Sequence, residues 1–400
     1  MRLGISTASF LSVAKQGEGV YLEQLLTGLQ KIDSANQYFV FMPAQHQSIF
    51  QTAASNVHVI EISNLVRYPI LSVLWYLFVY PFLLAKYRID VVHLPEIRRI
   101  PLFKVCPTVL TVADLTNFRI RGKAGTLRLV YNSLLCRFLL SSADAICVHA
   151  ENTKRDLQDI WRVSPDRISV IPHGIDSRFR TRQWNQISMF RAKYSIDDPA
   201  IVCVSRLEHP LKNHTVLLRA FARLKERGLQ HCLLLVGQRA KGHEIVEREI
   251  RQLGLTKAVR IFGFVPEEDL PYFYNVAQLS VFPSLYEGFG YPVLESFASG
   301  VPLVASRSSS ITEVAGNAAL LFQPQDDAEL AEKMWTVLQD VALQKTLIQS
   351  GFERVAQFSV EEEARRTLEL YQSTYSNSRK LPRESPGKET SDVKLPDRLS

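Results

Sequence analysis

Short apolar runs alternate with longer amphipathic stretches along most of the chain. In the first half, runs rich in β-branched and aromatic residues predict strands at 2–7, 38–42, 57–62, 90–94, 108–112, 144–149 and 168–172. Apolar residues at helical spacing lie between several of these runs, for example at 20–32 and 126–140. Alternating strands and helices are typical of a largely parallel sheet, so an α/β domain is expected here.

The alternation lapses at residues 173–199, which are polar and irregular and predict a linker with one short helix. It then resumes, with strands predicted at 200–205, 232–237, 259–264, 279–282, 302–306 and 318–322. Residues 326–375 have apolar side chains at helical spacing, whereas the residues after them contain three prolines and no aromatic side chain. The expected fold class is therefore α/β, with two doubly wound parallel-sheet domains, an interdomain cleft and a disordered tail at 377–400.

The composition is that of an ordinary globular protein. The 400 residues are 46% hydrophobic and 22% charged, which allows two domains with ample cores. The five cysteines are scattered and form no CxxC pair, so free thiols in a reducing compartment are expected. The first residues enter a strand without the long apolar core of a signal peptide, which favours a cytoplasmic location.

Residues 68–87 form the most apolar segment of the chain. They hold no charge between Arg67 and Lys86, but Pro69 and Pro81 leave only about eleven uninterrupted residues between them. A membrane-spanning helix needs roughly twenty such residues. A buried or interfacial helix is therefore expected in preference to a spanning one.

The net charge of +7 is unevenly distributed, with eight cations and the single acid Asp114 between residues 98 and 137. The cations are Arg98, Arg99, Lys104, Arg119, Arg121, Lys123, Arg128 and Arg137. Such a run is either a solvated face or a surface that faces anionic lipid head groups or a phosphorylated substrate. No recognised nucleic-acid-binding motif accompanies these residues, so nucleic acid is not an expected partner.

The stretch FPSLYEGFGYPVLE at 282–295 carries the strongest candidate chemistry. It combines the end of a strand, a turn that contains Gly288 and Gly290, and the start of a helix. Peptide N–H groups at such a helix start favour an anionic or hydroxyl-rich ligand. Glu295 lies about one turn into the helix and leans back toward Glu287, so two carboxylates flank the turn. Taken alone, the pattern also fits an ordinary loop with two solvated glutamates.

Other strands of the second half end in residues that suit the same ligand. Ligands of parallel sheets bind beyond the carboxyl ends of the strands, where Arg206, Lys212, Gly237 and Phe264 are expected on one rim. Two cations, helix-end N–H groups and two carboxylates fit a diphosphate joined to a sugar, as in a nucleotide sugar. The cations would stabilise the nucleoside diphosphate that leaves when the bond to the sugar carbon breaks.

Two pairs of adjacent acids are candidate metal ligands. Asp197-Asp198 lies in the linker, and Asp326-Asp327 lies at a helix start where capping explains it. Neither pair is at a strand end of this rim. We therefore predict chemistry without a metal and without any other cofactor.

Several motifs together resemble a known family. EGFGYPVLE at 287–295 is similar to the Glu-x7-Glu motif of the retaining glycosyltransferases of family 4 (glycosyl transferases group 1), which have the GT-B fold of two Rossmann-like domains. Further similar stretches are VSRLEHPLKNH at 204–214, residues 259–306, and IPHGID at 171–176. The resemblance extends to about residue 376. It implies an acceptor-binding domain at 1–178, to which a helix at about 359–376 returns, and a nucleotide-sugar-binding domain at 196–358.

The resemblance also implies roles for individual residues. The catalytic positions are Glu287 at the donor sugar and Arg206 and Lys212 at the diphosphate. The implied donor-binding residues are Glu295 at the ribose, Gly288, Phe289 and Gly290 through their N–H groups, Phe264 and Val265 at the base, and Gly237. The turn with Gly17 and Gly19 resembles the family's first glycine-rich loop, which approaches the donor phosphate and the acceptor.

One position departs from the family pattern. Many members have a His-Asp pair after the fifth strand of the first domain, whereas this chain has Ala113 before Asp114. Alanine cannot hydrogen-bond the sugar or the acceptor, so His93 or His173 takes that place on the acceptor side, or turnover is weakened. Each of these histidines is alternatively a packed or surface residue.

The leading hypothesis is a hexosyltransferase for envelope polysaccharide, cytoplasmic and peripheral on the inner face of the membrane. It would move a mannose-like hexose from a nucleotide diphosphate sugar to a polysaccharide or lipid-linked acceptor. The missing histidine leaves open a noncatalytic GT-B protein that binds nucleotide sugars or glycans. A soluble sugar-phosphate synthase of the same fold is also open, as are the base, the linkage and the oligomeric state.

Overall fold

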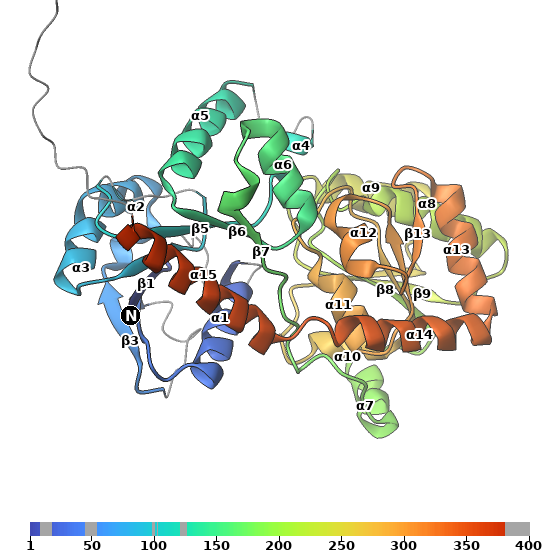
Figure 1. Ribbon diagram of the computed structural model, residues 1–400. Coiled ribbons are helices and arrows are strands. Elements are labelled where there is room, and N and C mark those ends of the chain that lie inside the picture. The colour runs from blue at the N-terminus through green and yellow to red at the C-terminus, as the bar shows by residue number, and fades with distance from the viewer. Residues whose placement is uncertain (9–17, 45–53, 98–100, 102, 121–125, 381–400) are drawn as a thin grey trace, which may run out of the picture.

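A computed structural model of the chain describes residues 1–8, 18–44, 54–97, 101, 103–120 and 126–380. The molecule has two lobes, each built around a parallel sheet with helices on both faces (Figure 1). The predicted fold class is confirmed, and the predicted strands are found within a few residues of their expected bounds.

The first sheet has seven parallel strands in the order β3-β2-β1-β4-β5-β6-β7. They are β1 (Arg2–Ser6), β2 (Gln37–Pro43), β3 (Val57–Ile62), β4 (Val91–Leu94), β5 (Thr108–Val112), β6 (Ala145–Val148) and β7 (Ile168–Val170). Its helices are α1 (Glu18–Ile32), α2 (Pro69–Leu74), α3 (Tyr80–Lys86), α4 (Thr116–Arg119), α5 (Thr126–Ser142) and α6 (Glu151–Trp161). Short helical turns are η2 (Asn64–Arg67), η3 (Trp75–Val79) and η4 (Pro165–Arg167).

The second sheet has six parallel strands in the order β10-β9-β8-β11-β12-β13. They are β8 (Ala200–Val204), β9 (Cys232–Val236), β10 (Val259–Gly263), β11 (Ala277–Phe282), β12 (Leu303–Ser306) and β13 (Leu320–Phe322). The helices are α7 (Trp184–Tyr194), α8 (His214–Glu226), α9 (His243–Gln252), α10 (Leu270–Asn275), α11 (Tyr291–Ala298), α12 (Ser309–Ala315), α13 (Asp327–Gln339) and α14 (Val341–Val355).

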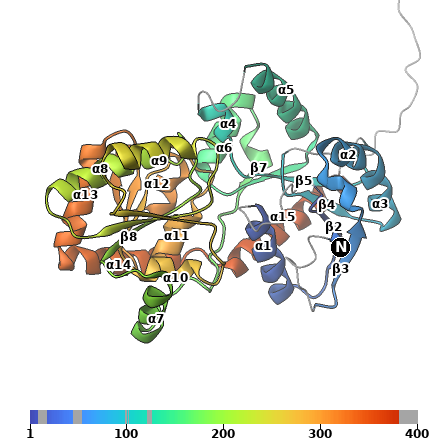
Figure 2. The same ribbon diagram turned by 180° about the vertical axis from the view of Figure 1, so that it is seen from behind.

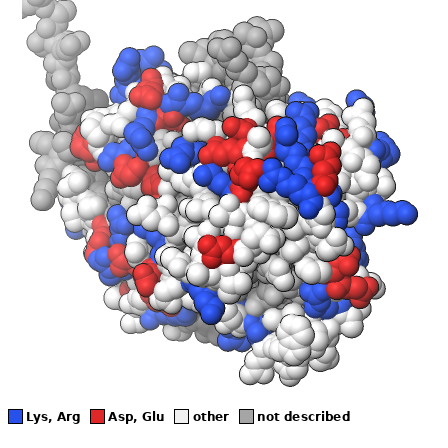
Figure 3. All heavy atoms as spheres, turned by 90° about the vertical axis from the view of Figure 1, so that its right-hand side faces the viewer, with Lys and Arg blue, Asp and Glu red and all other residues white. Residues whose placement is uncertain are grey.

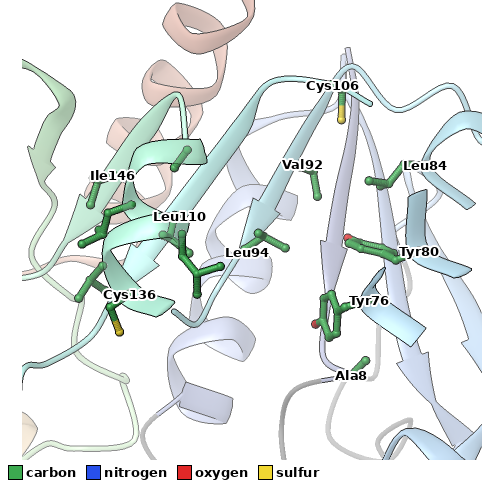
Figure 4. Close-up of a cluster of buried hydrophobic side chains, with 14 of the residues drawn as sticks. Ala8, Tyr76, Tyr80, Leu84, Val92, Leu94, Cys106, Leu110, Cys136 and Ile146 are labelled. Atoms are coloured by element: carbon green, nitrogen blue, oxygen red, sulfur yellow. The ribbon is translucent and has the colours of Figure 1, made fainter. Parts of the chain in front are cut away.

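The strands read as unbroken apolar runs because both faces of each sheet are covered. In β2, Phe39 and Phe41 point into a core beneath α3 and α5, whereas Tyr38 and Val40 point into a core beneath α1. Figure 4 shows the first of these cores, where Tyr76 and Tyr80 pack beside the sheet. The alternation of side chains along a strand thus fills two cores at once.

A last helix, α15 (Val360–Lys380), crosses from the second lobe and lies along α1 on the first sheet (Figures 1 and 2). Leu370 and Tyr371 join the same buried cluster as Leu22 and Leu25 of α1. The approach is close, because a Cβ added to Gly28 would meet the carbonyl oxygen of Val360 at 2.7 Å.

The apolar segment is helical without interruption from Pro69 to Lys86, in the order α2, η3, α3. The expectation that Pro81 limits the uninterrupted run to about eleven residues is wrong, because the helix continues through it to give 18 residues. The π-helical turn η3 ends just before the proline. Pro81 therefore lies in the first turn of α3, where a missing N–H costs little. By length and composition alone this run is one candidate membrane span among the described residues, and a third of it is buried inside the protein.

The basic stretch at 98–137 is only partly described. Arg98, Arg99, Arg121, Lys123 and the side chain of Arg128 lie outside the described residues. Lys104 pairs with Asp144 at 2.6 Å, and Arg119 pairs with Asp156 and Asp159. These two cations therefore belong to ion pairs within the first lobe.

Candidate functional site

The glycine-rich turn between β11 and α11 has the geometry that its sequence predicts. Gly290 is the residue before the first helical turn and has a φ of 109°, a conformation that a side chain would strain. Val293, Leu294 and Phe297 are buried and anchor α11 against the sheet. The peptide N–H groups at the start of α11 are thus held at a fixed place on the rim.

Glu287 and Lys212 meet at this turn. The Lys212 Nζ donates to Glu287 Oε1 at 2.5 Å, and the two side chains are only 12% and 16% exposed. The Glu287 N–H donates to Ser309 Oγ, and Ser310 Oγ donates to the Glu287 carbonyl oxygen. A cation and a carboxylate from separate loops are therefore positioned together before any ligand arrives.

Arg206 and Gly237 lie at the ends of the neighbouring strands. Arg206 pairs with Glu208 at 2.8 Å, but its side chain is 47% exposed and free to reorient toward a ligand. A Cβ added to Gly237 would lie 2.1 Å from the Ser205 carbonyl oxygen, so only glycine fits there. The predicted rim of Arg206, Lys212 and the glycine turn is brought together by the order of β9, β8 and β11 in the sheet.

Glu295 has a different environment from Glu287. Its Oε2 accepts a 2.6 Å hydrogen bond from the hydroxyl of Tyr274 on α10. Burial of the carboxylate raises the pKa of Glu295 to about 7, although the Tyr274 hydroxyl and the charge of Arg178 oppose the shift. Part of the side chain still reaches the surface. The carboxylate titrates near neutrality and accepts hydrogen bonds best above that pH.

The remaining donor-side positions are more exposed. Phe264 is largely exposed and Val265 is half-buried, directly after Gly263 at the end of β10. Phe289 is buried and packs edge-on against His173 with the ring centroids 4.9 Å apart. Gly17 lies outside the described residues, and a Cβ added to Gly19 would meet nothing within 4 Å.

The turn touches the first lobe directly. A Cβ added to Gly288 would lie 2.1 Å from the Ala113 carbonyl oxygen and 2.8 Å from the Asp114 Cβ. Asp114 is exposed, and its Oδ1 accepts from the Thr116 N–H at 2.9 Å. The structure therefore places the position that departs from the family pattern against the glycine turn itself.

Further contacts join the two lobes around α6. The carboxylate of Glu313 on α12 accepts from the N–H groups of Glu151 and Asn152, which begin α6, at 2.9 and 3.2 Å. The Tyr286 hydroxyl donates to Asp156, and Thr153 Oγ1 donates to the Gly288 carbonyl oxygen. The two lobes are thus in direct contact where α6 meets α12 and the glycine turn.

His93 does not face the cleft. It is 1% exposed, with Nδ1 hydrogen-bonded to the Tyr371 hydroxyl and Nε2 to Thr111 Oγ1, both at 2.7 Å. Burial and the nearby His149 lower its pKa to about 3. Of the two alternatives for His93, the structure supports the packed one, because both ring nitrogens are engaged inside the first lobe.

His173 is also enclosed, at 5% exposure, but beside the glycine turn. Its Nδ1 lies 2.8 Å from Glu363 Oε1 on α15, and its ring stacks between His149 and Tyr291. No sequence motif identifies Glu363, Asp156, Glu313 or Tyr274 as neighbours of the turn. Their positions depend on contacts between distant elements and have no local motif.

Two family models match this chain. The model described as "Glycosyltransferase Family 4" matches residues 16–179, and the model described as "Glycosyl transferases group 1" matches residues 187–354. Among curated proteins, the chain is 29% identical over 233 residues to the O-antigen chain mannosyltransferase B of Escherichia coli. That match covers 58% of this chain and 61% of the other. Across this and four further mannosyltransferases, the chain spans 26% to 61% of their own length.

Two solved structures are similar over almost the whole chain. Anabaena HepE in complex with UDP-glucose has a TM-score of 0.74 at 18% identity, over 93% of this chain and 100% of that one. Sucrose-phosphate synthase from Thermosynechococcus elongatus has a TM-score of 0.74 at 21% identity, over 94% of this chain and 100% of that one. These similarities show the fold, two parallel-sheet domains joined as in the GT-B proteins.

Proposed function

Because the chain belongs to glycosyltransferase family 4 and has the GT-B fold, we propose that it transfers a hexose from a nucleoside diphosphate sugar. The observation that carries the proposal is the Lys212–Glu287 pair beside the glycine turn, with Arg206 on the next loop. The second lobe holds the donor and the first lobe holds the acceptor. The relatives at 29% identity are mannosyltransferases, which supports a mannose-like sugar.

In this mechanism the diphosphate lies between Arg206 and Lys212, and the N–H groups at the start of α11 meet the sugar or its phosphate. Negative charge develops on the β-phosphate as the bond to the sugar carbon breaks, and the two cations stabilise it. Glu287 accepts from the sugar hydroxyls, and Glu295, above its pKa of about 7, accepts from the ribose. The reaction retains configuration, with the leaving phosphate taking the acceptor's proton, so no side-chain base and no metal are needed.

The test is turnover with a panel of nucleoside diphosphate sugars and extracted lipid-linked glycans. Arg206→Ala and Glu287→Ala each reduce release of nucleoside diphosphate by about 100-fold or more, as for other lost electrostatic contacts. Arg223→Ala is the matched control, because Arg223 pairs with Asp327 on the outside of the same lobe. Folded Arg206 and Glu287 variants that work as fast as the wild type would exclude this site.

The acceptor is a lipid-linked or polysaccharide glycan at the inner face of the membrane. Support comes from the outward side of α2, η3 and α3, where Ile70, Phe78 and Phe82 are 75%, 51% and 75% exposed. No acid occurs between Glu61 and Asp90, whereas Arg67, Lys86 and Arg88 flank the apolar side chains. Apolar side chains ringed by cations suit insertion among anionic lipid head groups, each cation adding about 1 kcal/mol.

Vesicle flotation tests the membrane contact. The protein floats with vesicles that contain anionic phosphatidylglycerol, floats less with neutral phosphatidylcholine, and is partly released by salt because the cations are screened. Equal recovery in the unbound fraction with both kinds of vesicle would remove the membrane from the proposal.

Two other functions make different predictions in the same assays. A noncatalytic GT-B protein, suggested by Ala113, binds a nucleotide in calorimetry but turns over no donor with any acceptor. A sugar-phosphate synthase, suggested by the structural similarity to sucrose-phosphate synthase, uses a soluble sugar phosphate as acceptor and ignores vesicles.

A further inference from the structure

A buried polar cluster lies where the first lobe, the linker and α15 meet the glycine turn. Its members are the buried His149 after β6, His173 after β7 and Glu363 in the first turn of α15, together with the half-buried Tyr291 at the start of α11. The rings of His149 and His173 are stacked with their centroids 3.5 Å apart, and those of His173 and Tyr291 with their centroids 4.8 Å apart. Residues from the first lobe, from the linker and from α15 therefore converge on the turn that the proposed donor site uses.

Glu363 makes two hydrogen bonds that position this cluster. Its Oε1 lies 2.8 Å from His173 Nδ1, and its Oε2 accepts from the Gly174 N–H at 2.8 Å. Among the described residues no Lys or Arg pairs with this carboxylate, which is held by two hydrogen bonds, from His173 and from Gly174. A buried carboxylate held in this way fixes the plane of the imidazole that it accepts from.

The ring of His173 in turn contacts both aromatic neighbours of Gly290. Phe289 meets it edge-on at 4.9 Å, and Tyr291 stacks on it with an angle of 19° between the rings. Gly290 is the residue whose left-handed backbone starts α11. The orientation of the N–H groups there consequently depends on where His173 is held.

We propose that Glu363 and His173 are positioning residues of the donor site: the carboxylate of α15 fixes the imidazole, and the imidazole fixes the aromatic residues on either side of Gly290. The inference rests on the proposed binding of a nucleoside diphosphate at this turn. Neither residue touches the ligand. Through these two residues, the returning helix α15 determines the orientation of the α11 N–H groups toward the nucleoside diphosphate.

A metal ion is the other use for such a cluster, since ligand atoms of His149, His173 and Glu363 lie within 4.8 Å of one another. A metal must lie near the plane of each imidazole that binds it. The two rings face each other at 3.5 Å with only 25° between their planes, so they do not point their nitrogens at one shared centre. His149 Nδ1 already donates to the Ile171 carbonyl oxygen at 2.9 Å.

The cluster also has a signature in pH. Burial raises the pKa of Glu363 to about 7, opposed by His149 and the Gly174 N–H. The other groups that face it stay in one form near neutral pH: burial lowers the pKa values of His149 and His173 to about 3 and raises that of Cys147 to about 12. Burial raises the pKa values of Tyr21, Tyr291 and Tyr371 still further above neutrality. Protonation below pH 7 takes an acceptor from His173 or Gly174 and loosens the turn.

The test is calorimetric binding of UDP, GDP and ADP to the full chain at pH 6, 7 and 8, with the tightest nucleotide carried forward. Glu363→Gln weakens binding about tenfold at pH 8, the worth of roughly one hydrogen bond, and raises the donor KM while kcat stays within about twofold. It also removes part of the rise in affinity between pH 6 and 8. The part that remains belongs to Glu295, whose pKa is also about 7.

Glu362→Gln is the control, because Glu362 is the preceding residue of α15 and its carboxylate pairs with Arg365 at the surface. Wild-type binding that Glu363→Gln leaves unchanged at every pH would overturn this inference alone. Absence of nucleotide binding by the wild type would overturn the proposed function and this inference with it. A stoichiometric metal ion that is lost from Glu363→Gln would also overturn it, because the cluster would then be a metal site.

Discussion

The two lobes are built on the same plan, but their outer faces differ. On the second lobe, cations and acids on α8, α9 and α13 pair with each other, as in Arg219–Glu249 and Arg223–Asp327, and Figure 3 shows both signs interspersed over that end of the molecule. On the first lobe, α2, η3 and α3 expose Ile70, Phe78 and Phe82. The surface of α8, α9 and α13 therefore suits water, whereas the surface of α2, η3 and α3 suits a less polar environment.

Near the glycine turn the lobes also differ, because there the second lobe carries more charged side chains than the first. The second lobe brings Arg206, Lys212 and Glu287 to its rim. The first lobe buries His93 and His149 in neutral form and offers Asp114 beside the glycine turn. Charge for a ligand therefore comes mainly from one lobe, and the following changes test that division.

The largest effect is expected from Lys212→Ala. It removes one cation from the rim and leaves Glu287 as a nearly buried carboxylate without its partner. Turnover of the donor falls by about 100-fold to 1000-fold, as when one preorganised donor is removed from an active site. Steady-state assays of nucleoside diphosphate release measure the change. Activity within a few-fold of the wild type would place the phosphate contacts elsewhere.

The next effect concerns the outer face of the first lobe. Phe78→Asp with Phe82→Asp weakens binding to anionic vesicles by about 100-fold or more, because each buried phenyl ring is worth about 1.5 to 3 kcal/mol. Co-sedimentation across lipid concentrations measures the partition constant. Val341→Asp is the matched control, since Val341 is 61% exposed on α14 of the second lobe. Equal losses in both variants would remove the distinction between the faces.

A smaller effect is expected where the lobes touch. Gly288→Ala puts a methyl group against the Ala113 carbonyl oxygen, so the turn must shift, and turnover falls by about tenfold for a displacement well below 1 Å. Gly4→Ala in β1 is the control, because a Cβ there meets the Ile89 and Leu84 side chains at 3.0 and 3.3 Å inside the first lobe. Parallel kinetics and thermal unfolding of both variants separate loss of fit from loss of fold. A fully active Gly288→Ala would mean that the lobes work further apart.

The smallest effect is on stability in acid. Burial lowers the pKa values of His93, His149 and His173 to about 3, below the value of about 6.5 expected when unfolded. The unfolded chain then binds more protons below pH 6.5, so stability falls as the pH drops from about 6.5 toward 3. The raised pKa values of Glu295 and Glu363 act in the opposite direction between about pH 7 and 4.5 and offset part of the loss.

His149→Phe should therefore reduce the fall in Tm between pH 7 and pH 5 by a few degrees. Scanning calorimetry at the two pH values measures it, with His243→Phe on the second lobe as control, because His243 is partly exposed. An unchanged fall in Tm would mean that His149 is not buried in neutral form.

Much of the fold could be predicted because both faces of each sheet are buried, which leaves continuous apolar runs such as 38–42 and 232–236. The π-helical turn before Pro81 could not be predicted, because a proline is compatible both with a break and with the first turn of a new helix. The rim of the second lobe could also be predicted, because the residues that follow each strand form a motif that is visible in the local sequence.

The contacts across the cleft were not accessible in this way. Gly288 meets Ala113, and His173 meets Glu363, through elements that lie far apart in the sequence. Nothing in the local sequence around Glu363 distinguishes it from its neighbours Glu361 and Glu362, which remain at the surface. Only the path of α15 decides which of the three acids is buried.

The position of α15 on the first lobe also bears on how the protein is made. The sheet of that lobe ends at Val170, yet the cluster on its α1 face includes Leu370 and Tyr371. A ribosome needs roughly 10 to 40 s to add the intervening stretch at about 5 to 20 residues per second. During that time α1 and the strands beneath it are incompletely covered. The lobe that is synthesised first is completed last, and chaperones or proteases can reach its unfinished face until α15 emerges.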